Sequence, residues 1–146
     1  MDDLDLRIRK ATYRTFVELG RAPHASEVAE ATGVGEQDVR ESWRRLHEAH
    51  ALVLDEAGEI RMAAPFSAVP TDFRVEAAGR SWFANCAWDA FGIGAAMHVD
   101  SAFETHCADC GESVTVQVRG GRADDASLLF NVPLPATQWW NDIGFT

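Results

Sequence analysis

The stretch AAPFSAVPTDFRVEA, residues 63–77, marks a change in the hydrophobic pattern of this 146-residue chain. Before it, apolar residues recur at the three-to-four-residue spacing of helices. After Pro70 they alternate with polar residues, as in a strand with one buried face. Pro65 and Pro70 bracket small residues, a composition typical of a linker. The pattern therefore predicts two parts, a helical one at residues 1–64 and a sheet-containing one at residues 65–146.

The first part is predicted to contain three helices and a hairpin. Apolar stripes indicate helices at residues 2–19 and 36–50, and a shorter helix between them begins at a Ser26 cap. Short apolar runs at residues 52–54 and 60–62 flank a turn and predict the hairpin. Three helices followed by a hairpin is the order of a winged helix-turn-helix module. We therefore expect residues 1–64 to be winged-helix-like.

The second part is predicted to be a small mixed β-sheet crossed by one helix, so the whole chain is assigned to the α+β class. Ser81 is expected to cap that helix, which begins at Trp82 and runs to about Phe91. A last helical segment is expected from residue 136 to residue 142. The strands are expected at residues 71–77, 99–105, 113–118 and 128–132.

The charge of the chain disfavours two classes of partner. The formal net charge is −10, and acidic residues exceed basic ones in both parts, 13 to 9 in residues 1–65 and 10 to 4 in residues 66–146. A negative protein is repelled by nucleic-acid phosphates and by anionic lipid. No apolar run approaches the ~20 residues of a membrane span, and the acidic start does not resemble a signal peptide. We expect a cytoplasmic protein that binds neither nucleic acid nor membrane.

Cys86 and Asp89 are the strongest candidates for chemistry. An odd number of cysteines without a secretion signal argues against a disulfide framework. Cys86 falls near a helix start, where the helix dipole favours a thiolate, and Asp89 lies one turn further on the same face. Asp89 stands among Trp82, Trp88 and Phe91, whose apolar side chains should raise the pKa of its carboxyl. The simpler interpretation is that Cys86 is a small buried hydrophobic residue.

Cys107 and Cys110 form a second candidate group. Their spacing, followed by Gly111, resembles one knuckle of a structural zinc site, and His98 or His106 could add a further ligand. Structural zinc usually has four ligands, and the chain contains no second knuckle. A tight turn with two free thiols is the alternative. We expect the protein to hold less than one zinc per chain.

The run Asn85-Cys86-Ala87-Trp88-Asp89-Ala90 resembles the active-site helix of the alkylmercury (organomercurial) lyase family. In that helix a cysteine-alanine-aliphatic-aspartate sequence follows an aromatic residue. The resemblance continues through Thr105-His106-Cys107, which is similar to the segment of the family's structural cysteine, and through Gly111 and the strand Ser113-Val114-Thr115-Val116. The resemblance implies that the N-terminal module packs on the catalytic part and does not bind DNA.

Two departures from the family pattern affect the expected activity. Trp88 stands where the family has an aliphatic residue, and the family's second catalytic cysteine is expected at about residues 141–146, where this chain has none. We therefore expect either a fragment or a shortened relative, which binds organomercurials more effectively than it cleaves them. Among the residues present, Cys107 or Cys110 could supply the second thiol.

The resemblance also implies a mechanism. Cys86 would bind the mercury of the substrate, because mercury(II) is soft and prefers thiolate. Asp89 would deliver a proton to the bound carbon and release a hydrocarbon. Hg(II) would then pass to small thiols or to mercuric reductase, as in mercury resistance, and no organic cofactor would be required.

Two other functions fit the sequence. One is a mercury- or zinc-binding thiol protein without turnover, which uses Cys107, Cys110 and Cys86. The other is a winged-helix, metal-responsive regulator. The charge pattern disfavours the regulator, because the third predicted helix mixes Arg40, Arg44 and Arg45 with four carboxylates.

The first prediction is that the protein does not bind duplex DNA specifically, because carboxylates offset the arginines of that helix. Fluorescence anisotropy at low salt measures the binding. Tight binding that weakens steeply with added salt would contradict the prediction and favour the regulator.

Overall fold

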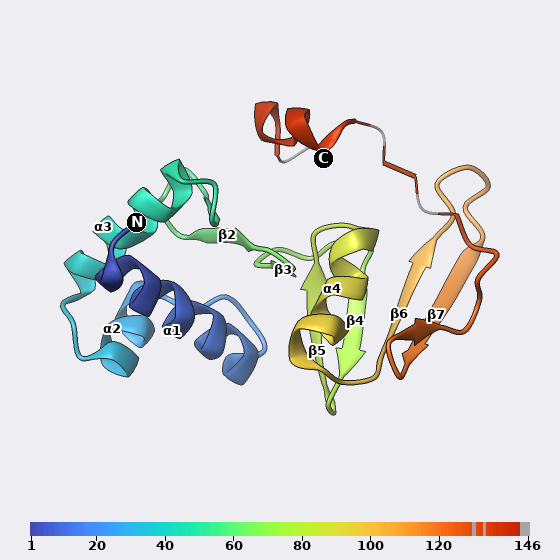
Figure 1. The fold of residues 1–146 in the computed structure, drawn as a ribbon, viewed down its shortest axis with the longest axis horizontal. Helices are drawn as coiled ribbons and strands as arrows, with labels where there is room; N and C mark the ends of the chain where they lie inside the picture. The colour runs from blue at the N-terminus through green and yellow to red at the C-terminus, as the bar shows by residue number, and fades with distance from the viewer. Residues whose placement is uncertain (130, 133, 144–146) are drawn as a thin grey trace.

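The computed structural model describes residues 1–129, 131–132 and 134–143 (Figure 1). In this part of the chain, three helices precede an antiparallel sheet, and one further helix packs on the sheet, so the predicted α+β class is confirmed. The predicted order of three helices and a hairpin is also observed. The helices are α1 (Asp3–Leu19), α2 (Ala25–Thr32), α3 (Glu36–Glu48) and α4 (Ala87–Met97), followed by the 3-10 helix η1 (Ala136–Asn141).

The described strands form one sheet in the order β1-β2-β3-β5-β4-β6-β7-β8. Every pairing in it is antiparallel, whereas a mixed sheet was expected. The reason is that α4 connects β5 to β6 across β4, which lies between them and runs antiparallel to both. The strands are β1 (Val53–Leu54), β2 (Ile60–Ala63), β3 (Phe66–Ser67), β4 (Arg74–Ala77), β5 (Arg80–Ala84), β6 (Ser101–His106), β7 (Ser113–Arg119) and β8 (Arg122–Ala123).

Two predicted elements are wrong. Residues 80–84, of which 82–84 were expected in a helix, form strand β5, because they pair with β4 on one side and β3 on the other and bury Trp82 and Ala84. The helix instead begins after an N-cap at Cys86. The strand expected at residues 128–132 is also not observed at residues 128–129 and 131–132, and residue 130 lies outside the described residues.

The N-cap of helix α2 lies two residues before the expected cap at Ser26. His24 is the N-cap, and the carboxylate of Glu27 accepts the backbone N–H of His24 at 2.7 Å, so Ser26 lies inside the helix.

Polar side chains are buried between α1 and α3, and each has a partner. Asp5 is 1% exposed and accepts hydrogen bonds from Ser42 Oγ and from Arg45 Nη2, both at 2.7 Å. Trp43 Nε1 donates to Thr12 Oγ1 at 2.9 Å. These contacts satisfy groups that would otherwise be costly to bury. The hydrogen bonds to Asp5 also lower its pKa to about 2, and the Arg45 guanidinium has the largest effect.

Three aromatic residues join the helical part to the sheet. The ring of Phe16 in α1 stacks on Phe66 of β3 at 5.1 Å, and Phe66 meets Trp82 of β5 edge-on at 6.0 Å. Trp82 Nε1 also donates to the carbonyl oxygen of Phe16 at 3.4 Å. All three side chains are at most 2% exposed. The two predicted parts of the chain therefore share one continuous core, and β2 and β3 pair across residues 64–65.

The arginines of α3 are engaged by carboxylates of the chain itself. Arg40 bonds Glu36 at 3.0 Å and Glu59 at 2.8 Å, and Arg45 bonds Asp5. This pairing lowers the positive charge available to a phosphate backbone. In the part of the chain that the structure describes, no helix is long and apolar enough to cross a membrane.

We predict that Asp5→Asn removes about 2 kcal/mol of stability at pH 6, because the pKa of Asp5 is about 2 in the folded state against an ordinary 3.8. A depressed pKa contributes stability that is fully present above pH 3.8 and is lost as the pH falls through about 2. The difference in the free energy of unfolding between Asp5→Asn and wild type should therefore decrease as the pH is lowered from 4 to 2. Urea unfolding followed by tryptophan fluorescence measures it.

The exposed carboxylate variant Glu56→Gln is the matched control and should track wild type at every pH. A pH-independent difference between Asp5→Asn and wild type would show that the Asp5 charge does not stabilise the fold.

Candidate active site

Cys86 occupies the junction between β5 and α4. Its backbone is extended, with φ −153° and ψ −179°, and its carbonyl oxygen accepts the N–H of Ala90 at 2.9 Å as the first bond of the helix. The thiol is partly buried and forms no disulfide. The strand therefore fixes the Cys86 backbone from one side and the helix fixes it from the other.

The Cys86 thiol is expected to stay protonated more readily than an exposed cysteine. Burial raises its pKa, and the nearby Asp89 charge raises it further. The backbone N–H groups of Asp89 and Trp88 at the helix start lower it, but burial outweighs them. The helix start thus favours the thiolate, as expected, but the desolvation of the thiol is the larger effect, and the pKa of Cys86 is raised.

Asp89 lies in the first turn of α4, in the same desolvated region. Burial raises the pKa of its carboxyl, as expected from the sequence. Asn85 opposes this shift, because its Nδ2 donates to Asp89 Oδ2 at 2.8 Å. Asn85 Nδ2 also approaches the carbonyl oxygen of Phe66 at 3.4 Å, and its Oδ1 is buried without a hydrogen-bond partner among the described residues. Asn85 thus anchors the carboxyl to the sheet.

Tyr13 of α1 is a residue of the N-terminal helix that interacts electrostatically with Asp89. Its hydroxyl donates to the carbonyl oxygen of Ala64 at 3.0 Å. Burial raises the pKa of Tyr13, the guanidinium of Arg9 lowers it, and the charge of Asp89 raises it, so Tyr13 and Asp89 are electrostatic neighbours. Arg9 lies over the Tyr13 ring, with its guanidinium carbon 5.3 Å from the centroid. No local sequence signal pointed to Tyr13, because it lies in the other half of the chain.

The three aromatic residues expected to shield Asp89 have different places. Trp82 is buried in the shared core with Phe16 and Phe66. Trp88 is 64% exposed, so it faces solvent and does not form a wall. Phe91 packs edge-on against Phe103 of β6 at 5.1 Å, which attaches α4 to the sheet. A helix starting at Trp82 would have placed that residue two turns before Asp89 on the same face, and the β5 strand removes that geometry.

Cys107 and Cys110 lie in the tight turn between β6 and β7. Cys107 N donates to Glu112 O and Gly111 N donates to Cys107 O, both at 2.8 Å, and Gly111 has φ +72°. Hydrogen bonds from the Cys110 and Asp109 backbone, and from the Cys110 side chain, lower the pKa of Cys107. Within the described residues, no three His, Cys, Asp or Glu side chains are grouped to hold a metal. Neither His98 nor His106 therefore completes a site there.

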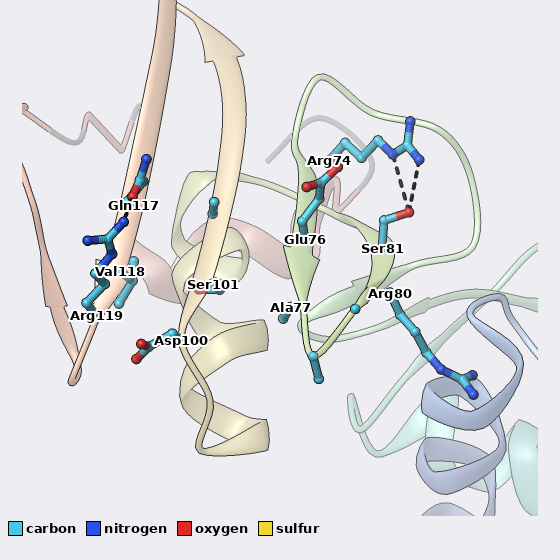
Figure 2. Close-up of a pocket in the computed structure, with 13 residues that line it drawn as sticks. Arg74, Glu76, Ala77, Arg80, Ser81, Asp100, Ser101, Gln117, Val118 and Arg119 are labelled. Atoms are coloured by element: carbon cyan, nitrogen blue, oxygen red, sulfur yellow. Dashed lines mark hydrogen bonds between the residues drawn. The ribbon is translucent and has the colours of Figure 1, made fainter.

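A groove of about 610 Å³ lies at the other end of the sheet (Figure 2). Its charged lining is mixed, with Arg74, Arg80 and Arg119 beside Glu76 and Asp100. Figure 2 shows Arg74 turned onto Ser81, to which it donates at 3.1 Å. Neither Cys86 nor Asp89 lines the groove, so it is separate from the candidate active site.

The family model of the alkylmercury lyases matches residues 66–146, the span that contains Cys86 and Asp89. The chain belongs to the alkylmercury lyase family. A solved structure with the same fold is that titled "Crystal structure of the mercury-bound form of MerB2", with a TM-score of 0.67 and 24% sequence identity. The match covers 86% of this chain, more than residues 66–146 alone, and 60% of that chain. A search of curated proteins found no match.

The site geometry predicts that Asn85→Ala raises the pKa of Asp89, because the variant loses the amide donor that stabilises the charged carboxylate. Titration of the carboxyl carbon by ¹³C NMR measures the shift. Gln37→Ala is the matched control, since Gln37 donates to the exposed Glu41 with the same four-residue spacing. An unchanged Asp89 pKa in Asn85→Ala would show that this contact does not control the carboxyl.

Proposed function

We propose that this member of the alkylmercury lyase family cleaves carbon–mercury bonds by protonolysis, with Cys86 as the mercury-binding thiol and Asp89 as the proton carrier. The observation that carries the proposal is the placement of the two groups. A thiol and a carboxyl share the first turn of one helix, and burial raises the pKa of both. The family match over residues 66–146 supports the choice of substrate class.

The first step is substrate binding. The Cys86 sulfur forms a bond to the mercury of an organomercury cation, and the thiol proton moves to the Asp89 carboxylate. The thiol supplies its own proton because its pKa is raised. The carboxylate accepts that proton readily because its pKa is raised as well. The products of the step are a Cys86–mercury–carbon adduct and a neutral Asp89.

The second step is cleavage. Neutral Asp89 gives its proton to the carbon bound to mercury, and the electron pair of the carbon–mercury bond forms the new carbon–hydrogen bond. A hydrocarbon leaves, Asp89 returns to its charged form, and Hg(II) stays on Cys86 until small thiols or mercuric reductase remove it. This sequence consumes one proton from the thiol and requires no organic cofactor.

Asn85 and Tyr13 are positioning residues in this scheme. Asn85 holds one carboxylate oxygen at 2.8 Å and limits how far burial raises the Asp89 pKa. Tyr13 is held by the Ala64 carbonyl, and the charge of Asp89 raises its pKa. Burial and the Asn85 amide act in opposite directions on the Asp89 pKa, which allows Asp89 to be charged when it accepts the proton and neutral when it donates it.

We predict that Asp89→Asn slows single-turnover release of arene from an arylmercury compound by at least about 100-fold, because an amide cannot carry the proton. The reaction is run with excess small thiol and followed by gas chromatography. Asp3→Asn, an exposed carboxylate at the start of α1, is the control and should react as wild type.

The binding step is tested separately in the Cys107→Ser/Cys110→Ser variant, where Cys86 is the only thiol. Intact mass spectrometry should show one arylmercury adduct per chain, retained in Asp89→Asn and absent after Cys86→Ser. Adduct formation by wild type with no arene released would argue instead for a mercury-binding protein without turnover.

A further inference from the structure

The β6–β7 turn presents two thiols that the proposed lyase reaction does not use. Cys110 is exposed and Cys107 is half-buried, and neither forms a disulfide. Two backbone hydrogen bonds of 2.8 Å close the turn around them, from Cys107 N to Glu112 O and from Gly111 N to Cys107 O. The side chains of the two cysteines also interact with each other. The turn thus holds two thiols close together on a surface that solvent reaches.

The number of ligands at the turn decides which metal it suits. Among residues 1–129, 131–132 and 134–143, no third His, Cys, Asp or Glu joins the two cysteines in a metal-binding group. Structural zinc is almost always held by four ligands, so two thiols are too few for it. Mercury(II) is soft, prefers thiolate, and commonly binds two sulfur atoms in a linear arrangement. The donor set therefore fits Hg(II) better than zinc.

The sheet places this turn at the same end as Cys86. Arg74 of β4 pairs with Phe83 of β5 and also with Glu104 of β6. Cys86 and Cys107 each follow three residues after those partners, on strands that run in the same direction. Figure 1 accordingly shows the start of α4 and the β6–β7 turn at the same end of their strands. Strands β5 and β6 flank β4, so at Arg74 they are separated by two inter-strand distances, about 10 Å.

We propose that Cys107 and Cys110 form a second, solvent-facing site that binds Hg(II) as a bis-thiolate, independently of Cys86. Binding is a thiol exchange. Hg(II) carried by two small thiolates forms bonds to both cysteine sulfur atoms, the two cysteine protons pass to the leaving thiolates, and two small thiols are released. No oxidant or reductant takes part. The two thiols and the geometry of the turn support this site without reference to the proposed lyase reaction.

Cys86→Ser is the starting variant of the test, because it removes the other thiol. The probe is Hg(II) supplied as its bis-glutathione complex, and bound metal is counted by native mass spectrometry and by sulfur–mercury absorption. Cys86→Ser should bind one Hg(II) per chain. Adding Cys107→Ser or Cys110→Ser should weaken binding by at least about 100-fold, since the second bond of a chelate forms at high effective concentration.

A backbone variant separates the turn geometry from the thiols. Gly111→Ala, in the Cys86→Ser background, should weaken Hg(II) binding, because alanine disfavours φ +72° and the turn then opens. Gly121→Ala is the matched control, with φ +75° and open space around it in a different turn, and should bind as Cys86→Ser does. Circular dichroism confirms that each variant is folded.

Three results would overturn the proposal. The first is equal Hg(II) retention by Cys86→Ser with and without both turn cysteines. The second is the failure of Cys86→Ser to take Hg(II) from glutathione. The third is one zinc per chain held by Cys107 and Cys110 in the purified protein. None of these results depends on whether the chain cleaves carbon–mercury bonds. The experiments therefore test this site independently of the proposed lyase activity.

Discussion

Phe66 lies between Phe16 and Trp82, and this aromatic cluster determines how the two halves of the molecule meet. The rings lie 5.1 and 6.0 Å apart, and the Trp82 indole donates to the Phe16 carbonyl. Aromatic pairs of this kind contribute about 0.5–1.5 kcal/mol each beyond the area they bury. Phe16 is three residues from Tyr13 on α1, so the same packing fixes the helix turn that holds Tyr13, whose pKa the charge of Asp89 raises.

The candidate site is defined by desolvation more than by charge pairing. Asp5 and Asp89 illustrate the contrast. Asp5 is less exposed to solvent than Asp89, but Arg45 and Ser42 stabilise its charge, and its pKa is low. Asp89 is stabilised by the amide of Asn85, which only partly offsets burial, so its pKa is raised. A carboxylate paired with a cation stays charged and contributes to stability. A buried carboxyl that is bonded only to an amide has a raised pKa, so it can take up a proton and donate it to a neighbouring group.

Much of the fold could be predicted from the sequence, and the main error concerns strand β5. The helices at residues 3–48 and the strands of β6 and β7 follow local periodicity. The sequence predicts a helix over residues 82–84, partly because Ser81 resembles a cap, but pairing with two neighbouring strands overrides that local preference. The close sequence positions of Cys86 and Asp89 were visible, and the structure places them on one turn. Tyr13 could not be predicted, since only tertiary packing brings it near Asp89.

Strand β5 also restricts how the sequence around the site can change over time. Trp82 and Ala84 face the core because side chains alternate along the strand, and Cys86 leaves it immediately afterwards. Inserting or deleting one residue between Trp82 and Cys86 would either turn the indole out of the core or rotate the start of α4. A change in length within residues 82–86 therefore disturbs the core and the site together. The interval between the tryptophan and the cysteine thus ties the position of the Cys86 thiol to the packing of the core.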